Sequence, residues 1–208
     1  MGPVEGMASV IPAAGASARM GTPKPLLPVG GATLIEHLLK TYRAAGVTDL
    51  RVVVGFDADR VTAVLARLGV RWVANARPEG GMFSSVQVGV RDLAATVRGF
   101  FVHPADVPLV TPATLIRLAE HLEGSAAVCP AFRGRHGHPP LLSAALIPVV
   151  LAYDGEGGLR RLLASLGHGL RTLECDDPAV LVDVDTPADW RRVQQMVEGP
   201  SWAERTWP

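Results

Sequence analysis

The segment from residues 11 to 24 combines small residues with basic side chains in a way that suits phosphate binding. It follows a short apolar run and contains an Ala-Ala-Gly turn, Arg19 and Lys24. Small residues let backbone N–H groups approach a phosphate closely, because no side chain holds the ligand away. Arg19 offers a planar fork for phosphate oxygens, and Lys24 offers a mobile point charge. The alternative interpretation is a glycine-rich turn with two solvated basic residues.

This segment differs from two common nucleotide-binding loops. It lacks the Gly-x-Gly-x-x-Gly spacing of dinucleotide folds, and it lacks the Gly-Lys pair followed by Ser or Thr that P-loop enzymes use. A nicotinamide-dependent oxidoreductase of similar architecture is therefore disfavoured by the sequence.

Acidic residues follow two of the apolar runs. Asp106 comes after a strand expected at 99–103, and Asp183 and Asp185 stand at the end of one expected at 180–184. A carboxylate at the C-terminal end of a strand faces the ligand crevice of an open α/β sheet, and Mg²⁺ prefers such hard oxygen ligands. Two carboxylates on one strand face repel each other unless a cation joins them. We therefore expect Asp106 to bind Mg²⁺ with help from Asp183 or Asp185. Alternatively, Asp106 caps a turn between two prolines.

The elements that must position these residues alternate along the chain. Short β-branched runs and helical patterns in alternation predict a mostly parallel sheet with helices on both faces. Strands are expected at residues 9–11, 51–55, 70–74, 99–103, 126–129, 140–142, 170–173 and 180–184. Helices are expected at residues 34–45, 57–68, 84–95, 111–122, 143–152 and 159–166, and from 186 onward. Thr-Pro pairs at 111 and 186 predict helix starts, and Gly46 predicts a helix end.

Composition limits the class of protein. The chain has 208 residues, of which 48% are hydrophobic, and its 20 basic and 20 acidic side chains balance. Neutral balance argues against binding nucleic acid or membranes by bulk charge. Cys129 and Cys175 lack a Cys-x-x-Cys spacing, which favours buried thiols in a reducing compartment. No apolar run could span a bilayer and no signal-peptide pattern opens the chain, so a cytoplasmic location is expected.

The domain organisation expected from this pattern is simple. We expect a disordered lead-in at residues 1–8, one domain at 9–198 and a loosely held tail at 199–208. Either Met1 or Met7 can serve as the start.

Taken together, these motifs resemble a known group of enzymes. The string from Ile11 to Lys24 is similar to the N-terminal signature of nucleotidyltransferases that activate sugars, isoprenoid precursors and molybdopterin, and most similar to the molybdenum-cofactor cytidylyltransferase branch. The resemblance runs from Val10 to about Val193 through further motifs in the expected order. It implies a three-layer α/β sandwich with a Rossmann-like, mostly parallel mixed sheet of the nucleotide-diphospho-sugar transferase type.

The resemblance also implies an activity: Mg²⁺-dependent transfer of CMP from CTP to the phosphate of molybdopterin or its molybdenum form, with release of pyrophosphate. The catalytic residues that it implies are Arg19, Lys24 and Asp106. The nucleotide-binding residues are Ala13, Ala14, Gly15, Ser17, Asn75, Gly81 and Ser85. The acceptor-binding residues are His138, Gly157 and Arg160, and the metal ligands are Asp106, Asp183 and Asp185. A transient contact with a molybdoenzyme or its chaperone is also implied.

Some of these assignments carry alternatives. The family commonly has glycine where this chain has Ala105, a mild departure. His136 and His138 suggest a metal pair but lack a third ligand, and His138 could belong to a purely structural turn. The register also leaves Arg161 as an alternative to Arg160, and either arginine could be a solvated surface residue.

The substrates are less constrained than the reaction. In similar enzymes an Ala-Ala-Gly loop accompanies CTP and an Ala-Gly-Gly loop accompanies GTP, so Ala14 favours CTP because its bulk would crowd a purine. The acceptor could instead be a sugar 1-phosphate, methylerythritol phosphate or a small phospho-acid, and the donor could be GTP. A carrier of nucleotide or molybdopterin without turnover is a further alternative.

Overall fold

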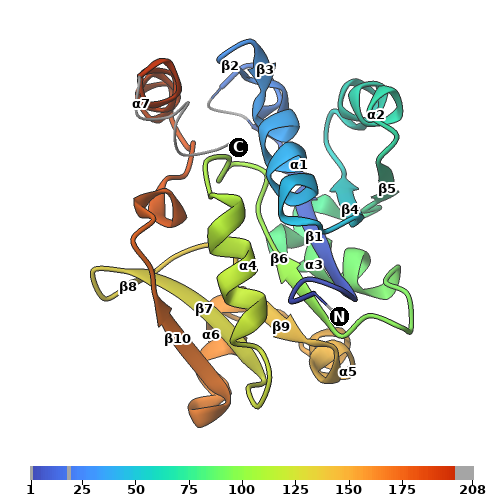
Figure 1. Cartoon of the computed structure of the whole chain (residues 1–208). Helices are drawn as coiled ribbons and strands as arrows, with labels where there is room; N and C mark the ends of the chain where they lie inside the picture. Colours follow the sequence, from blue (N-terminus) through green and yellow to red (C-terminus); the bar gives the residue numbers. More distant parts are fainter. Residues whose placement is uncertain (1, 18–19, 200–208) are drawn as a thin grey trace.

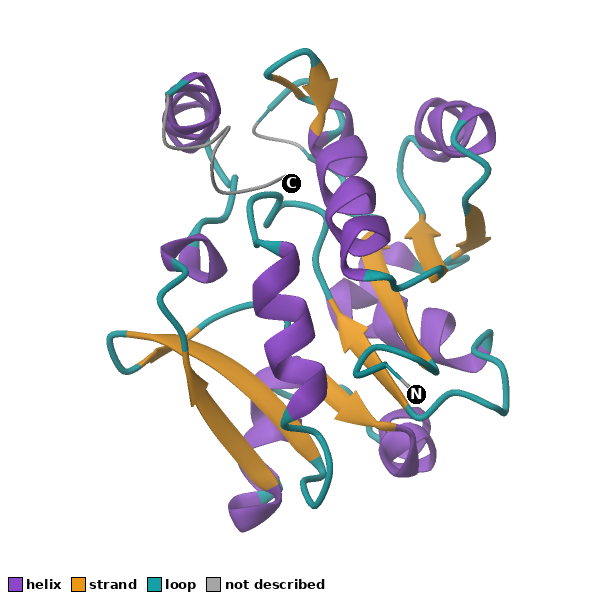
Figure 2. Ribbon diagram, viewed as in Figure 1, coloured by secondary structure: helices purple, strands orange, loops and turns teal. Residues whose placement is uncertain are grey.

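The protein folds around one mixed sheet (Figures 1 and 2). The computed structural model describes residues 2–17 and 20–199; Arg19 and the tail from residue 200 onward lie outside the described residues. The eight-stranded sheet has the order β10-β7-β9-β6-β1-β4-β5, with β8 paired to β7. The strands are β1 (Met7–Ala13), β4 (Asp49–Val54), β5 (Arg71–Ala74), β6 (Gly99–Val102), β7 (Ala127–Phe132), β8 (Arg135–His136), β9 (Leu141–Ser143) and β10 (Leu170–Glu174).

Helices cover both faces of this sheet. Helices α1 (Leu34–Ala45) and α4 (Pro112–Glu120) lie on one face, in front of the sheet in Figure 1, with α2 (Ala58–Arg67) packed into the same core. Helices α3 (Gly81–Arg91), α5 (Ile147–Ala152) and α6 (Gly158–Ser165) lie behind the sheet around a second core. The predicted three-layer α/β sandwich with a mostly parallel mixed sheet is therefore confirmed.

The central strands determine where a site can form. Strand β1 lies between β4 and β6 and runs parallel to both, with Ala13 opposite Val54 and Val10 opposite Val102. Strand β9 runs antiparallel to its two neighbours, which makes the sheet mixed. Because parallel strands end at the same edge, the loops after β1, β4 and β6 meet there.

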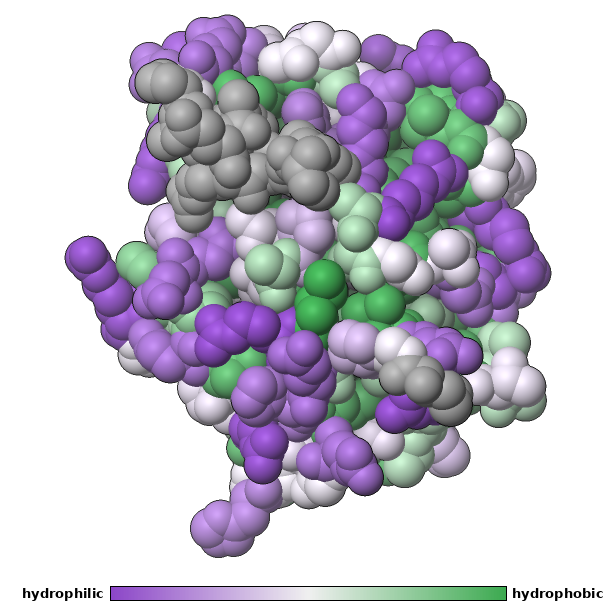
Figure 3. Space-filling view, viewed as in Figure 1, coloured by the Kyte–Doolittle hydropathy of each residue, from purple (hydrophilic) through white to green (hydrophobic). Residues whose placement is uncertain are grey.

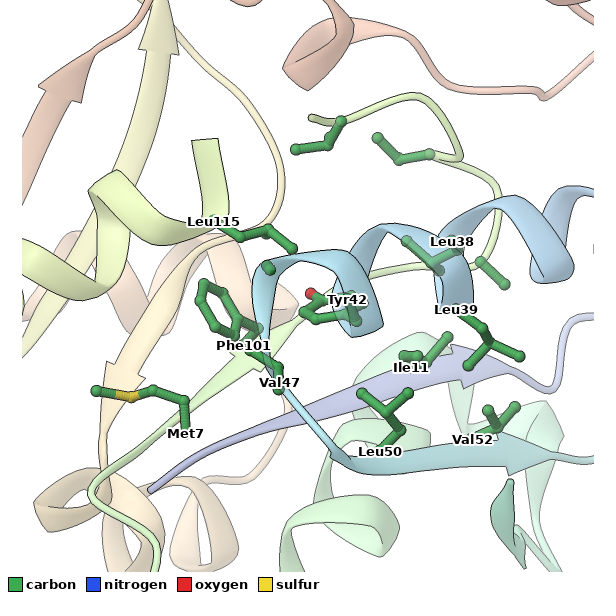
Figure 4. Close-up of a cluster of buried hydrophobic side chains, with 14 of the residues drawn as sticks. Met7, Ile11, Leu38, Leu39, Tyr42, Val47, Leu50, Val52, Phe101 and Leu115 are labelled. Carbon is green, nitrogen blue, oxygen red and sulfur yellow. The ribbon is translucent and has the colours of Figure 1, made fainter. Parts of the chain in front are cut away.

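Buried apolar side chains hold α1 against the sheet. Figure 4 shows Leu38, Leu39 and Tyr42 of α1 directed toward Ile11 of β1 and Phe101 of β6. The Tyr42 and Phe101 rings meet edge to face at 5.6 Å. On the outer surface in Figure 3, hydrophilic side chains form most of the outline, and hydrophobic ones form smaller patches between them.

Side-chain caps begin three of the helices, and the predicted glycine ends one of them. Helix α1 begins with a capping box between Thr33 and Glu36 and ends at Gly46, whose φ of 88° is left-handed. Thr111 and Thr186 cap α4 and α7 (Pro187–Glu198), in both cases with proline in the first turn. Helix α7 packs against a small hairpin, β2 (Pro28–Val29) and β3 (Ala32–Thr33), through a third apolar cluster.

Several predicted boundaries were wrong. Residues 180–184 are not a strand: Pro178–Leu181 form a 3₁₀ turn, and Asp177 caps it through Ala179 N–H. Asp183 and Asp185 therefore do not share the face of a strand. Strand β1 begins at Met7, which pairs with Gly99, two residues before the strand start expected at residue 9.

Two helices also differ from the prediction. Helix α3 begins at Gly81 rather than at residue 84. The helix expected at 143–152 is divided into a 3₁₀ turn, Ala144–Leu146, followed by α5, which has Pro148 in its first turn.

Both cysteines are free and buried, as predicted. None of the helices in the described part of the chain combines the length and apolarity that a membrane crossing requires.

Candidate active site

One lysine joins two carboxylates from distant parts of the chain. Lys24 Nζ lies 3.3 Å from Asp106 Oδ2 and 2.5 Å from Asp185 Oδ1. The three residues come from the loop after β1, the loop after β6 and the segment before α7. We refer to Lys24, Asp106 and Asp185 as the charged junction.

Backbone hydrogen bonds hold the segments of the charged junction together. Val184 N–H donates to Asp106 O over 2.9 Å, which places the segment before α7 beside the Asp106 loop. Asp185 N–H donates to Asp189 Oδ2, and Asp189 also caps α7 in a capping box with Thr186. Asp189 therefore both caps the first turn of α7 and holds the backbone of Asp185.

The junction distinguishes between the two candidate aspartates. Lys24 contacts Asp185, whereas the charge of Asp183 acts on His138, which also lies within the field of Asp106. His138 N–H donates to Val180 O, and no Cβ would fit on Gly137 because it would lie 2.4 Å from Val180 O. The glycine-histidine turn is thus packed against the segment that carries both aspartates.

Burial and charge shift the proton affinities in this region. Burial lowers the pKa of Lys24, but hydrogen bonds and charges from Asp185 and Asp106 outweigh burial and leave that pKa above its ordinary value. Burial raises the pKa of Asp106, and the negative charge of Asp185 adds to this rise while Lys24 opposes it. Burial lowers the pKa of His138, and its Nδ1 is buried without a hydrogen-bond partner among the described residues.

A buried chain of hydrogen bonds connects the Asp106 loop to helix α1. His103 Nε2 lies 2.8 Å from Val107 O, and Tyr42 Oη lies 2.9 Å from His103 Nδ1. A carbonyl can only accept, so Nε2 carries the proton and Nδ1 accepts from the tyrosine hydroxyl. Burial lowers the pKa of His103 to about 3, so this histidine is neutral. The chain ties the turn around Asp106 to helix α1.

Two adjoining cavities flank the loop after β1. A cavity of about 140 Å³ is lined by Ser17, Lys24 and Asp106 among others, and one of about 230 Å³ by Ala14, Gly81 and Ser85 among others. Both include Pro12, Gly15 and Asp106, so they form one cleft with a polar and an apolar end. The loop is held by Lys24 N–H, which donates to Ser17 Oγ over 2.8 Å.

Most residues predicted to bind a nucleotide line this cleft, but Asn75 does not. Asn75 Nδ2 donates to Ser84 Oγ at 2.8 Å and to Ser85 Oγ at 3.0 Å, while its Oδ1 accepts from Arg77 N–H. Its amide is therefore engaged within the protein, and it orients Ser85, which does line the cleft.

Sequence reasoning missed several apolar residues of the cleft. Phe56, Met82, Pro12 and Pro78 line the larger cavity, and the first two are exposed. Phe56 follows Gly55 at the end of β4, and a large side chain beside a glycine at a strand end was the available signal.

The predicted acceptor segment forms a glycine turn before α6. Gly155, Gly157 and Gly158 all have positive φ, and a Cβ on Gly155 would lie 3.6 Å from the Phe83 ring in the first turn of α3. Arg161 pairs with Glu156, whereas Arg160 is exposed on α6. This turn therefore lies beside the helix that lines the cleft, and neither arginine lines the two cavities.

The charged junction has the donor chemistry that a divalent cation requires. Two carboxylates already gather around one positive charge, and hard oxygens of this kind suit Mg²⁺ or Mn²⁺. Within the described residues, no group of three or more His, Cys, Asp or Glu side chains is arranged around a metal position. Mg²⁺ commonly keeps several waters and takes phosphate oxygens, so one or two carboxylates can suffice to hold it.

Comparison with known proteins shows the family to which the chain belongs. The family described as "MobA-like NTP transferase domain" matches residues 9–171. The chain is 34% identical to nicotine blue oxidoreductase of Paenarthrobacter nicotinovorans over 187 residues, 85% of this chain and 91% of that protein. It is also 34% identical to phosphoenolpyruvate guanylyltransferase of Rubrobacter xylanophilus over 189 residues, 86% of this chain and 88% of that protein.

Solved structures show the same fold. Rv0371c of Mycobacterium tuberculosis H37Rv superposes with a TM-score of 0.80 at 30% identity, covering 91% of this chain and 97% of that one. A further structure of Rv0371c, 28% identical with a TM-score of 0.77, was solved in complex with manganese and covers 91% of this chain and 98% of that one. The chain therefore belongs to the MobA-like NTP transferase domain family and is a nucleotidyltransferase of the MobA-like type.

Proposed function

We propose that this protein is a cytoplasmic enzyme that transfers CMP from CTP to the phosphate of molybdopterin, with Mg²⁺ as cofactor and pyrophosphate as by-product. The observation that carries the proposal is Lys24, which lies between Asp106 and Asp185 and lines the smaller cavity together with Asp106. Residues 9–198 would act as one domain in this reaction.

The reaction brings two anions together, so the chain must first offset their repulsion. Lys24, Arg19 and the N–H groups of the loop after β1 would bind the triphosphate and stabilise the charge that develops on the leaving pyrophosphate. Asp106 and Asp185 would hold Mg²⁺, which screens the phosphate charges when it is bound. An acceptor phosphate is already ionised near neutral pH and needs no general base, so positioning by the cleft provides most of the rate enhancement.

The preference for CTP is supported by tight packing around Ala14. A Cβ on Gly55 would lie 2.7 Å from Ala14 Cβ and 3.0 Å from Ala14 O, so the end of β4 presses against the loop. The loop cannot retreat at this point to admit a larger base. GTP remains the alternative donor, because one relative is named phosphoenolpyruvate guanylyltransferase.

The acceptor proposal is supported by the glycine turn before α6 and by the turn at His138. Three glycines with positive φ leave the backbone of residues 155–158 open to a phosphate. His138, Gly157 and Arg160 would form the acceptor side. Sugar 1-phosphates, methylerythritol phosphate and small phospho-acids such as phosphoenolpyruvate are the alternative acceptors.

A matrix of donors and acceptors tests this proposal. Pyrophosphate release should be measured for each of the four NTPs against molybdopterin, a sugar 1-phosphate, methylerythritol phosphate and phosphoenolpyruvate. The proposal expects the highest rate with CTP and molybdopterin. Activity with GTP alone would reject the cytidylyl assignment, and activity with another acceptor alone would reject molybdopterin.

Two other functions remain to be separated by experiment. One relative is named an oxidoreductase, so oxidation of NADH or NADPH should be assayed in parallel with pyrophosphate release. A carrier without turnover would bind CTP with Mg²⁺, while Asp106→Ala would leave every measured rate unchanged.

A further inference from the structure

Two exposed apolar side chains line the larger cavity, and the proposed function gives them no role. Phe56 keeps 41% of its surface exposed and Met82 keeps 50%, although the core of this protein buries most large apolar residues. Burial of such a side chain would ordinarily stabilise the folded protein, so exposure of both carries a cost. Both residues line the same cavity of about 230 Å³.

The backbone prevents Phe56 from turning into the core. Phe56 N–H donates to Ala14 O over 3.3 Å, and Gly55 is packed against Ala14 and Pro78 with no space for a Cβ. On its other side, Asp57 has a left-handed φ of 54° and precedes α2. A turn fixed at both ends therefore holds an aromatic ring at the wall of the cavity.

The first turn of α3 similarly directs Met82 outward. Its neighbour Phe83 is buried and packs edge to face against Tyr153, with ring centroids 5.3 Å apart. Successive helical residues point in directions about 100° apart, so burial of Phe83 leaves Met82 exposed. A methionine is flexible and polarizable, which suits contact with the face or edge of an aromatic ring.

The other residues that line the two cavities indicate which class of ligand would fit. Pro12, Ala14 and Pro78 add apolar surface, whereas Ser85 offers a hydroxyl and Gly15 a backbone N–H. Pro12, Gly15 and Asp106 are shared with the polar cavity that contains Lys24. A ligand that fills both cavities would meet apolar surface at one end and the positive charge of Lys24 at the other, which suits the base and the triphosphate of a nucleoside triphosphate.

We propose that Phe56 and Met82 form a clamp for the nucleobase, with the Phe56 ring stacking on the base. This assignment rests on the proposed function for the identity of the ligand. Every base has a π face, so stacking on Phe56 would add affinity for any nucleoside triphosphate. The packing at Ala14 would then discriminate between small and large bases.

The test compares a ligand that has a base with one that lacks it. Isothermal titration should measure the Kd of CTP and of inorganic tripolyphosphate, each with Mg²⁺, for the wild-type chain, Phe56→Ala, Phe56→Leu and Phe56→Trp. Val149→Ala is the matched control, because Val149 is 46% exposed and does not line the cavity. Melting temperatures check that each variant is folded.

The clamp predicts a selective loss. Phe56→Ala should weaken CTP binding by about tenfold to a hundredfold, the size of aromatic stacking on one base, and leave tripolyphosphate binding unchanged. Met82→Ala should weaken CTP binding by a smaller factor than Phe56→Ala. The Kd of CTP for Phe56→Leu should lie between those of Phe56→Ala and the wild type, and Phe56→Trp should retain CTP binding.

Equal loss for both ligands, or no loss for CTP, would overturn the clamp. So would wild-type protein that binds none of the four NTPs more tightly than tripolyphosphate. Binding does not depend on turnover, so an inactive protein that still shows selective loss would reject the proposed function and keep the clamp.

Discussion

The two ends of the cleft differ in whether their side chains already have partners within the protein. At the charged junction, Lys24 already pairs with Asp106 and Asp185, and backbone hydrogen bonds hold the surrounding segments. At the apolar end, Phe56 and Met82 line the same cavity and remain largely exposed. The first end is therefore organised before a ligand arrives, whereas the second gains burial only when a ligand binds.

The difference indicates a division of labour. In the proposed function, charges that hold phosphates and metal would serve any nucleoside triphosphate, because every donor carries the same triphosphate. The apolar end would contact the base, which differs between donors. We therefore expect changes at the charged junction to affect turnover and changes at the apolar end to affect binding and choice of nucleotide.

Asp106→Asn should have the largest effect. The substitution keeps the shape of the side chain but removes the charge that would hold Mg²⁺, so turnover should fall by about 10³-fold or more. The metal-free melting temperature should stay within about 3 °C of the wild-type value. Steady-state pyrophosphate release and thermal melting are the measurements. A variant that retains the wild-type rate would remove the charged junction from the mechanism.

Lys24→Ala should have the next largest effect. Lys24 acts on charge that develops during the reaction, so kcat should fall by about 10²-fold, with a smaller change in KM. Lys40→Ala is a suitable control, because Lys40 is exposed on α1. A change confined to KM would show that Lys24 only binds the substrate.

The two candidate metal ligands should separate in a metal titration. Asp185→Asn should raise the Mg²⁺ concentration for half-maximal activity by about tenfold, equivalent to about 1.4 kcal/mol. Asp183→Asn should raise it less, because Lys24 contacts Asp185 and the charge of Asp183 acts on His138. The opposite order of effects would assign the metal to Asp183.

The smallest effect concerns the support beneath the charged junction. Burial lowers the pKa of His103 to about 3 from 6.5, so the unfolded chain takes up this proton first on acidification. The contribution of neutral His103 to the free energy of unfolding is present above about pH 6.5 and is lost progressively toward about pH 3. The loss between pH 8 and pH 6 is about 1 kcal/mol. His103→Gln should remove this dependence while keeping a donor for Val107 O.

Urea unfolding of the wild type and His103→Gln over this pH range measures the difference. His168→Gln, at an exposed position, is the control. Parallel pH profiles for the wild type and His103→Gln would show that His103 titrates normally in the folded protein.

Much of the fold could be predicted because local signals agree with the packing. The caps at Thr111 and Thr186 and the terminator at Gly46 each mark a helix boundary in the structure. The prediction of a strand at 180–184 was wrong because alternating apolar residues are also buried in this irregular segment. Hydrophobic periodicity alone does not distinguish such a segment from a strand.

The candidate site could be predicted only in part. Asp106 and Lys24 were identifiable from their positions after strands, but the contact of Lys24 with Asp185 spans 161 residues and depends on tertiary packing. The hydrogen bonds that engage Asn75 and the exposure of Phe56 are likewise properties of the folded chain. Residue types indicated the chemistry, and the structure was needed to show which groups lie together.

A crystal structure of the wild-type protein with CTP and Mg²⁺ tests the division of the cleft most directly. We expect the triphosphate and the metal at Lys24, Asp106 and Asp185, and cytosine between Phe56 and Met82. A nucleotide with its phosphates away from Lys24 and Asp106, or with its base outside the Phe56 cavity, would contradict this division.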